Sequence, residues 1–280
     1  MAIEVFNRFE NKYLIDADTF YELTGVLHSR MVPDVHNPVC PDKKDGKHEY
    51  AYYTISNIYY DTEDDYLIRQ SLSHPLYKEK LRLRSYGVPG LDDIVFLELK
   101  KKFQGIVNKR RTKIPLCTAY TFLNGEHYGT LPEPQPCMNL QVLKEIGVFL
   151  KRYALVPKVY IAYDRLAFFD KNSGDLRISF DKNIRTRRHG LQLEKGDFGD
   201  SLILENQRLM EIKSAGAMPL WLSALLSELG VFKKSFSKYG TEYTNYLQAG
   251  RGPAAPISEI PAAAGLSSFP PATGTINEGM

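Results

Sequence analysis

The sequence predicts an α+β fold, namely an antiparallel β-barrel tunnel of about eight strands with helices packed on the outside. Three observations support this prediction. Many segments alternate between apolar and charged side chains with a period of two, which is typical of half-buried strands. Few segments have helical periodicity. The charged faces of the strands are dominated by arginine and lysine, so a sheet closed with these faces inward would enclose a basic lumen.

The predicted strands are best illustrated by one segment. Lys80, Arg82 and Arg84 alternate with Leu81 and Leu83, so the strand has one cationic and one apolar face. The segments with this character are 4–14, 52–60, 78–86, 93–102, 106–114, 157–167, 175–181 and 202–213, with 183–188 as a candidate ninth.

Four segments are predicted to be helices, because each combines an apolar stripe with a suitable first residue. They run from Asp16 to about Arg30, from Asn139 to about Tyr153, from Pro219 to Gly230, and from near Ser237 through Tyr246. The proline-containing stretches 32–46 and 131–136 are predicted to be loops within one domain. Residues 249–280 are rich in Ala, Gly, Pro and Ser, so we expect a disordered tail after a single domain of residues 1–248.

Composition restricts the class of protein and its compartment. Cys40, Cys117 and Cys137 are too few and too dispersed for a disulfide framework or a zinc site, which indicates a reducing environment. The N-terminus lacks the apolar core of a signal peptide, and no apolar run approaches the roughly 18 residues of a membrane helix. We therefore expect a cytoplasmic protein with no membrane segment in this chain.

The distribution of charge is more informative than its sum of +3. Packed cations repel one another strongly at low dielectric, so a basic lumen requires anions, and a chain of phosphates would satisfy it. Sparse carboxylates such as Glu10, Glu98 and Glu211 could hold a divalent cation against those phosphates. The sequence contains no GxxxxGK motif and no GxGxxG motif, so the usual phosphate loops are excluded. A nucleic-acid partner is not expected, because the cations lie on inward faces.

Nine short segments together resemble the VTC (vacuolar transporter chaperone) domain of polyphosphate polymerases, within the CYTH-like superfamily of triphosphate tunnel metalloenzymes. They occur in family order over about residues 4–247. The segments are Arg8–Tyr13, Tyr59–Thr62, Leu81–Tyr86, Phe96–Lys100, Asn108–Arg111, Tyr163–Arg165, Leu176–Asp181, Leu209–Lys213 and Ser235–Tyr239.

The resemblance implies a tunnel that binds ATP or another nucleoside triphosphate at one end and inorganic polyphosphate, triphosphate or pyrophosphate along its length. The residues that match catalytic tunnel cations are Lys12, Arg82, Arg84, Lys109, Arg165 and Arg177. Those that match or adjoin substrate-binding positions are Glu10, Lys100, Tyr163, Lys213, Ser237 and Lys238. Glu211 matches the metal-binding glutamate, which implies Mn²⁺ or Mg²⁺ as cofactor, and Glu98 is expected to orient Arg82 or Arg84.

Two positions depart from the family pattern. The first strand reads Arg8-x-Glu10-x-Lys12, whereas hydrolases of the superfamily carry ExExK, and the lost carboxylate favours transfer over hydrolysis. Ser235 stands where eukaryotic-type polymerases have a lysine.

The function expected from the resemblance is metal-dependent transfer of the γ-phosphoryl of ATP, or of another triphosphate, to a polyphosphate chain. Two alternatives stay open: a tripolyphosphatase or nucleoside triphosphatase of the same fold, and a non-catalytic polyphosphate-binding module.

Overall fold

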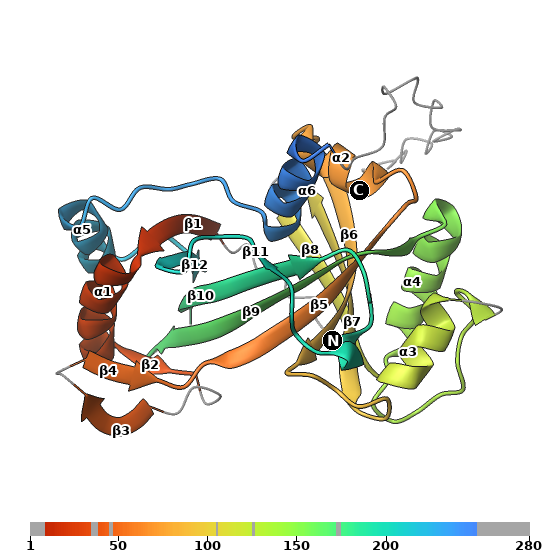
Figure 1. The fold of residues 1–280 in the computed structure, drawn as a ribbon, viewed down its shortest axis with the longest axis horizontal. Helices are drawn as coiled ribbons and strands as arrows, with labels where there is room; N and C mark the ends of the chain where they lie inside the picture. Colours follow the sequence, from red (N-terminus) through yellow and green to blue (C-terminus); the bar gives the residue numbers. More distant parts are fainter. Residues whose placement is uncertain are drawn as a thin grey trace, which may run out of the picture.

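The structure is a computed structural model that describes residues 9–34, 39–44, 47–104, 106–124, 127–171 and 175–250 (Figure 1). Residues 251–280, which make up nearly all of the predicted tail, lie outside the described residues, as do residues 1–8. Among the helices of the described ranges, none is long and apolar enough to cross a membrane.

A large antiparallel sheet forms the centre of the molecule, as the alternating segments predict. Its strands follow the order β1 (Phe9–Asp16), β12 (Gln207–Ser214), β10 (Leu176–Arg187), β9 (Val156–Asp170), β5 (Tyr53–Asp61), β6 (Tyr77–Tyr86), β7 (Ile94–Phe103) and β8 (Ile106–Pro115). Two short strands extend it, since β2 (Met31–Pro33) pairs with β9 and β11 (Asp200–Ser201) pairs with β10.

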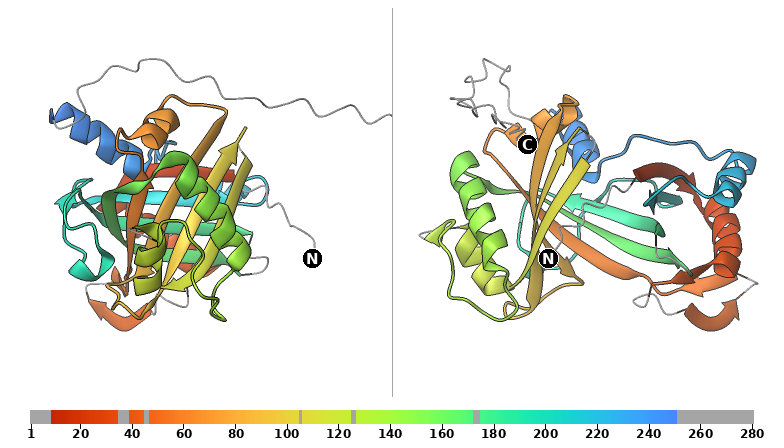
Figure 2. Two further views of the ribbon diagram at one scale, coloured as in Figure 1. Left: turned by 90° about the vertical axis from the view of Figure 1, so that its right-hand side faces the viewer. Right: turned by 180° about the vertical axis from the view of Figure 1, so that it is seen from behind.

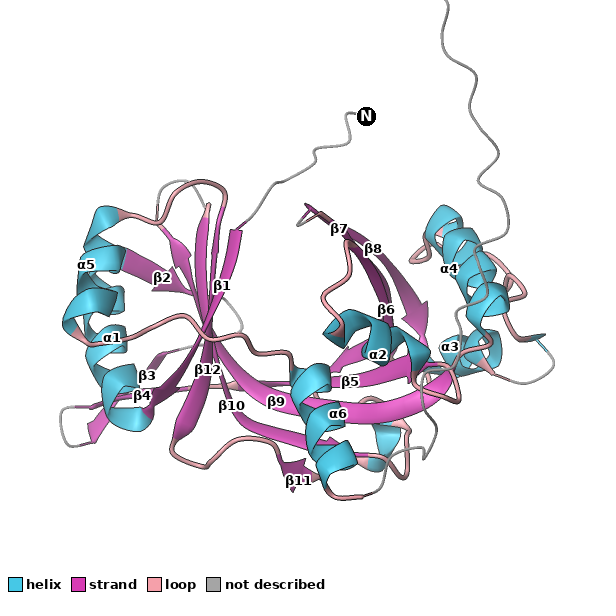
Figure 3. Ribbon diagram, turned by 90° about the horizontal axis from the view of Figure 1, so that it is seen from above, coloured by secondary structure: helices cyan, strands magenta, loops and turns pink. Residues whose placement is uncertain are grey.

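The sheet is curled rather than closed (Figure 3). Strands β1 and β8 are its two edges, and within the described residues no ladder joins them. The α+β fold and the antiparallel sheet are thus confirmed, while the barrel has an open side. Because side chains alternate along each strand, the curl gives the sheet an inner face and an outer face.

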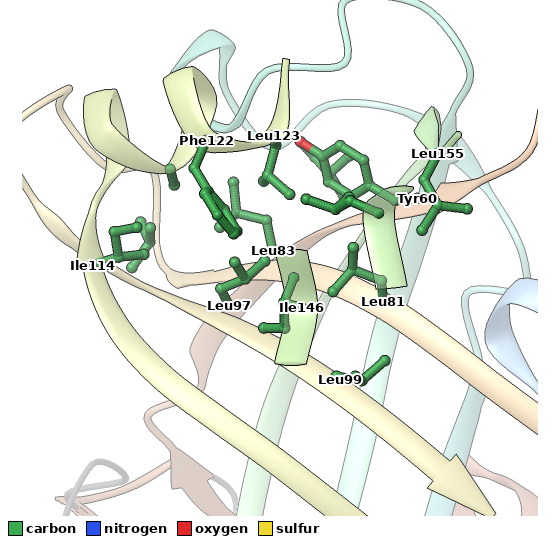
Figure 4. Packing of buried hydrophobic residues seen from close by; sticks show 14 of the residues in the cluster. Tyr60, Leu81, Leu83, Leu97, Leu99, Ile114, Phe122, Leu123, Ile146 and Leu155 are labelled. Carbon is green, nitrogen blue, oxygen red and sulfur yellow. The ribbon is translucent and has the colours of Figure 1, made fainter. Parts of the chain in front are cut away.

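Helices cover the outer face at opposite ends of the molecule (Figures 1 and 2). At one end lie α1 (Ala17–Arg30) and α5 (Leu220–Glu228), and at the other lie α3 (Leu116–Leu123) and α4 (Leu140–Tyr153). Leucines of β6 and β7 pack against α3 and α4, where Phe122 and Ile146 are buried (Figure 4). Phe20, Leu222 and Leu226 of the other pair pack on β9, β10 and β12.

A third core lies on the inner face, which sequence periodicity did not predict. The helix α6 (Lys238–Gln248), in contact with α2 (Tyr66–Leu72), places Tyr239 and Tyr243 against Ile161 of β9 and Leu209 of β12. A hydrogen bond fixes the start of α6 to the sheet, because the Tyr239 hydroxyl donates to Asp61 Oδ2 of β5 at 3.1 Å. One part of the inner face is therefore apolar and filled by α6.

Most predicted elements have the expected position. The helices α1, α4 and α6 begin after the predicted caps Asp16, Asn139 and Ser237, whose side chains each accept a backbone N–H. The separate segments 175–181 and 183–188 form the single strand β10, which is interrupted by a bulge between Lys182 and Arg185.

Three predictions of local structure were incomplete. The stretch 32–46, predicted to be a loop, contains β3 (Val39–Lys44), which forms a hairpin with β4 (Lys47–Tyr50). The helix α3 was not predicted, because its residues include several with higher strand than helix propensity. The helix α2 was missed as well, since its cap is remote in sequence: Asp61 accepts the N–H groups of Leu67 and Ile68.

The outer core generates a test of the fold. We expect Ile146→Ala to lower the free energy of unfolding by about 2–5 kcal/mol, because Ile146 is fully buried between α4 and the sheet. The matched control on the same helix is Val148→Ala, at a residue that is 71% exposed, and a change within about 0.5 kcal/mol is expected. Urea unfolding measures both, and equal effects of the two variants would contradict this packing.

Candidate functional site

The charged residues of the inner face are brought together by strand register. Lys12 of β1 lies opposite Glu211 of β12, and Arg82 of β6 lies opposite Glu98 of β7. In each pair both residues occupy the inward positions of their strands. Since the period of a strand is two, the neighbouring inward positions carry further charges, and two groups of cations form around buried carboxylates.

The first group, here named the Glu98 cluster, consists of Glu98 with Arg82, Arg84, Lys109 and Arg111. Glu98 has 1% of its surface exposed. Its Oε2 lies 2.6 Å from Arg82 Nε and 3.8 Å from Arg84 Nε. Its Oε1 lies 2.7 Å from Lys109 Nζ and 3.3 Å from Arg111 Nε. One carboxylate from β7 thus faces four cations from the strands on either side of it.

The pKa of Glu98 reflects these contacts. Burial alone would raise the pKa of this carboxyl, but the charges of Arg82, Arg84 and Lys109 outweigh burial and hold the pKa well below its usual range. Glu98 is therefore ionised at neutral pH, and its contacts fix the guanidinium of Arg82 at the inner surface. The predicted orientation of Arg82 by Glu98 agrees with this geometry.

The second group, here named the Glu211 cluster, consists of two buried carboxylates and the four cations around them. The carboxylates are Glu211 and Asp181, and the cations are Lys12, Arg165, Lys213 and Lys238. Glu211 Oε1 lies 3.3 Å from Lys238 Nζ and 3.6 Å from Lys12 Nζ, and its Oε2 lies 3.5 Å from Lys213 Nζ. Asp181 accepts two hydrogen bonds from Arg165, at 2.7 and 2.8 Å. It also lies 2.6 Å from Lys238 Nζ, so Lys238 joins the two carboxylates.

Electrostatics in the Glu211 cluster follow the same rule. Burial would raise the pKa of Glu211, but the charges of Lys238, Lys213 and Lys12 outweigh it and hold the pKa well below the usual range. Asp181 is likewise held below its usual pKa, since Arg165 and Lys238 outweigh complete burial. Both carboxylates therefore remain charged, and they neutralise part of the cationic face.

Glu10 of the edge strand β1 contacts β7, the strand next to the other edge. Its Oε1 lies 3.9 Å from the Nζ atoms of Lys12 and Lys213. Its Oε2 lies 3.9 Å from Lys100 Nζ of β7. The last pair spans the open side of the sheet. The connection that leads to α6 is held to β1 as well, since Lys12 Nζ donates to Phe236 O at 3.0 Å.

Two tyrosines of the inner face contact arginines of the Glu98 cluster. The Tyr59 hydroxyl accepts from Arg82 Nη1 at 3.1 Å, and the Tyr163 hydroxyl accepts from Arg84 Nη2 at 3.3 Å. Burial would raise the pKa of each tyrosine, but the neighbouring cations outweigh burial and lower it. A phenol with a lowered pKa donates a stronger hydrogen bond, and each hydroxyl that accepts from arginine still has its own proton to donate.

The predicted site residues are nearly all brought together. Those in the two clusters or in direct contact with them are Glu10, Lys12, Arg82, Arg84, Lys100, Lys109, Tyr163, Arg165, Glu211, Lys213 and Lys238. Ser237 caps α6 and lies beside Lys80. Arg177 is set apart, since its guanidinium pairs with Asp34 at 3.7 Å and lies over the Phe169 ring.

Other residues at these clusters were not among the predicted site residues. Lys80 and Arg111 are two residues from Arg82 and Lys109, so strand parity alone could have added both. Asp181 has the parity of Arg177, but its pairing with Arg165 depends on the order of β9 and β10 in the sheet. Ser235, the departure from the family pattern, is exposed.

A divalent metal fits the residues present only together with substrate. Among the described residues, no group of three or more His, Cys, Asp or Glu side chains could hold a metal ion. Glu211 and Glu10 nevertheless share the neighbours Lys12 and Lys213, so two carboxylates lie near each other on the inner face. Mg²⁺ is often bound by one or two carboxylates plus substrate phosphates, and this donor set is of that kind.

The curled antiparallel sheet thus has an inner face on which buried carboxylates lie within an excess of cations, a charge distribution suited to an anionic ligand. The sequence model of the VTC domain matches residues 7–246, and the chain belongs to the VTC domain family. No curated protein matches the chain. Among solved structures, it is similar to a putative adenylyl cyclase, HpAC1 from Hippeastrum, whose description reports a dominant triphosphatase activity. That similarity has 17% identity and a TM-score of 0.46, and covers 86% of this chain and 95% of that one.

The Glu98 cluster generates a test by stability. We expect Glu98→Gln to lower the free energy of unfolding at pH 7 by about 3–5 kcal/mol, because it leaves four cations without their carboxylate. The folded-state pKa of Glu98 is lowered, so its stabilising effect is complete above the unfolded-state pKa of about 4.3 and is lost as pH falls through the folded-state pKa. The difference between wild type and variant should therefore shrink in acid.

The matched control for this test is Glu145→Gln on α4. Glu145 pairs with Arg110 at 3.2 Å with both side chains partly exposed, so a loss below about 1 kcal/mol is expected. Urea unfolding between pH 3 and 7 measures the two variants. A Glu98→Gln penalty as small as that of the control would show that the cluster does not depend on its carboxylate.

Proposed function

We propose that this protein is a metal-dependent phosphotransferase that makes inorganic polyphosphate. It transfers the γ-phosphoryl of ATP, or of another nucleoside triphosphate, to the end of a polyphosphate chain in the tunnel. One observation carries the proposal: cations outnumber carboxylates on a single inner face, in two adjacent clusters. A donor triphosphate and an acceptor chain can be held there side by side, and membership of the VTC domain family supports the same reaction.

Positioning supplies most of the catalysis in this proposal. The terminal oxygen of a phosphate chain is already anionic, so no side chain has to remove a proton from it. Arginine holds phosphate oxygens in a bidentate manner, and Arg82 is preoriented by Glu98 at 2.6 Å. A cation that is fixed before the reaction stabilises the charge of the transition state without reorganisation.

The two clusters divide the work. Arg82, Arg84 and Lys109 bind one set of phosphates, and Lys12, Arg165 and Lys238 bind the other. Arg177, which lies apart beside Asp34, contacts a more distant phosphate of the chain. Lys100 and Lys213 are both within 3.9 Å of Glu10, so they stand ready to exchange that carboxylate for phosphate oxygens.

Mn²⁺ or Mg²⁺ held by Glu211 would neutralise charge on the phosphates of donor and acceptor when it is bound. Lys12, Lys213 and Lys238 hold the Glu211 carboxylate in the ionised form that a hard cation requires, since their charges keep its pKa low.

Product analysis tests the proposal. Purified protein incubated with ATP and Mn²⁺ or Mg²⁺ should form long-chain polyphosphate, which a stained gel detects. We expect Arg82→Ala to lower the rate by about a hundredfold or more, the usual effect of removing one preorganised donor. The control is Arg110→Ala, which removes an arginine from the other face of β8 and should leave the rate unchanged.

Other products would overturn the proposal in distinct ways. Release of free phosphate without polymer would indicate a tripolyphosphatase or nucleoside triphosphatase. Binding of polyphosphate without turnover by any divalent metal would indicate a binding module. Polymer formation at an undiminished rate by Arg82→Ala would retain the reaction and reject the role of the Glu98 cluster.

A further inference from the structure

Lys80 occupies the inner face of β6 between the two clusters. It lies opposite Lys100 of β7 and two residues before Arg82. Its Nζ donates to Ser237 Oγ at 3.4 Å and lies 6.0 Å from the centroid of the Tyr239 ring, so α6 covers it. Within the described part of the chain, no carboxylate oxygen lies within 4.0 Å of this ammonium.

The lack of a carboxylate distinguishes Lys80 from the nearby inner-face cations of the two clusters and from Lys100. Arg82, Lys109, Lys100 and Lys12 each lie within 4.0 Å of a glutamate oxygen. A half-buried ammonium without a counter-ion is costly, and it gains most from an anion that arrives from outside. The position of Lys80 therefore points to a charge that is left for the ligand to neutralise.

The groups around Lys80 favour a phosphate over other anions. Ser237 Oγ accepts from both Lys80 and the Gly240 N–H, so its own hydroxyl proton can be donated to a further oxygen. The Tyr59 hydroxyl on the neighbouring strand β5 accepts a hydrogen bond from Arg82, so its own proton can also be donated to a ligand oxygen. A phosphoryl group has several acceptor oxygens and can receive these donors and the ammonium together.

We propose that Lys80 binds a phosphoryl group of a condensed phosphate, with Ser237 as the neighbouring donor, at a position between the Glu98 and Glu211 clusters. The inference rests on the proposed function, because it assumes that the tunnel takes condensed phosphates. The phosphoryl group bound by Lys80 lies between the phosphates that bind to one cluster and those that bind to the other.

The charge state of Lys80 supports this role and makes it measurable. Burial lowers the pKa of Lys80 to about 8. Lys100 of β7, Lys78 of β6 and Lys12 of β1 lower it further, while Tyr59 of β5 acts in the opposite direction. Ser237 and Tyr239 are the groups of α6 that face it, and neither carries a charge to offset the lysines.

A bound phosphate must raise the pKa of Lys80, because an adjacent anion favours the charged form. Binding near pH 8 is therefore accompanied by proton uptake at Lys80. The uptake is about half a proton when the pH equals the pKa of Lys80 in the free protein. Below about pH 7 the ammonium is already charged and little uptake occurs. As pH rises through 8, the affinity for phosphate falls.

The first experiment measures binding of sodium tripolyphosphate by calorimetry, without ATP or metal, at pH 7. Lys80→Met should bind about tenfold more weakly than wild type, or about 1.4 kcal/mol. Its melting temperature without ligand should be equal to or higher than that of wild type, because a half-buried charge without a counter-ion is removed. A lysine with a merely structural role would lower the melting temperature instead.

The second experiment uses Lys80→Arg, which keeps a charge that does not titrate below pH 12. Calorimetry at pH 8 in two buffers of different ionisation enthalpy counts the protons taken up. Wild type should take up about half a proton more than Lys80→Arg, and its affinity should fall relative to the variant between pH 7 and 9. The control is Lys144→Met, an exposed lysine of α4, which should match wild type in all measurements.

The outcomes separate this inference from the function it rests on. If wild type does not bind tripolyphosphate, the proposed function fails. If wild type binds while Lys80→Met binds equally well, or if Lys80→Arg takes up as many protons as wild type, only the role of Lys80 is rejected.

Discussion

Repulsion between like charges is the constraint on which this structure depends. Strands β1, β12, β9, β6, β7 and β8 direct lysines and arginines toward one another, and such a face is stable only where counter-charges lie within it. Glu98 and Glu211 meet that requirement from β7 and β12, each within 4 Å of four cations. Because a buried carboxylate among cations cannot be protonated near neutral pH, the arrangement is permanent, and it leaves an excess of positive charge for a ligand.

The apolar part of the inner face strengthens the charged part. Tyr239 and Tyr243 of α6 fill the space beside Ile161 and Leu209, and this excludes water from one side of the Glu211 cluster. Interactions between charges increase as the local dielectric falls, so the same cations would attract an anion more strongly there than on a surface open to water. The helix thus serves both the hydrophobic core and the electrostatics of the site, and Lys238 at its first turn joins Asp181 to Glu211.

Sequence periodicity was sufficient for what depends on one strand at a time. The parity of Lys12, Arg82, Arg84, Lys100 and Lys213 placed each on an inward face, and the caps Asp16, Asn139 and Ser237 marked the starts of three helices. What depends on strand order was beyond it. The pairing of Asp181 with Arg165 and the contact of Arg177 with Asp34 depend on which strands are neighbours. The contact of Glu10 with Lys100 depends on the curl of the sheet. The capping of α2 by Asp61 was hidden for a similar reason, since the acceptor is six and seven residues from its donors.

The contacts of α6 have a consequence for the biosynthesis of the chain. Lys238 meets Asp181, and Tyr239 meets Asp61, a residue 178 positions earlier. A ribosome has therefore released every strand of the sheet before the last helix can dock, and domains generally fold as units during synthesis. Until that moment the nascent protein presents the inner face of its sheet uncovered on the α6 side. A chain that stalls after β12 and before α6 therefore leaves Ile161 and Leu209 without their packing partners from α6, and such exposed apolar surface favours aggregation.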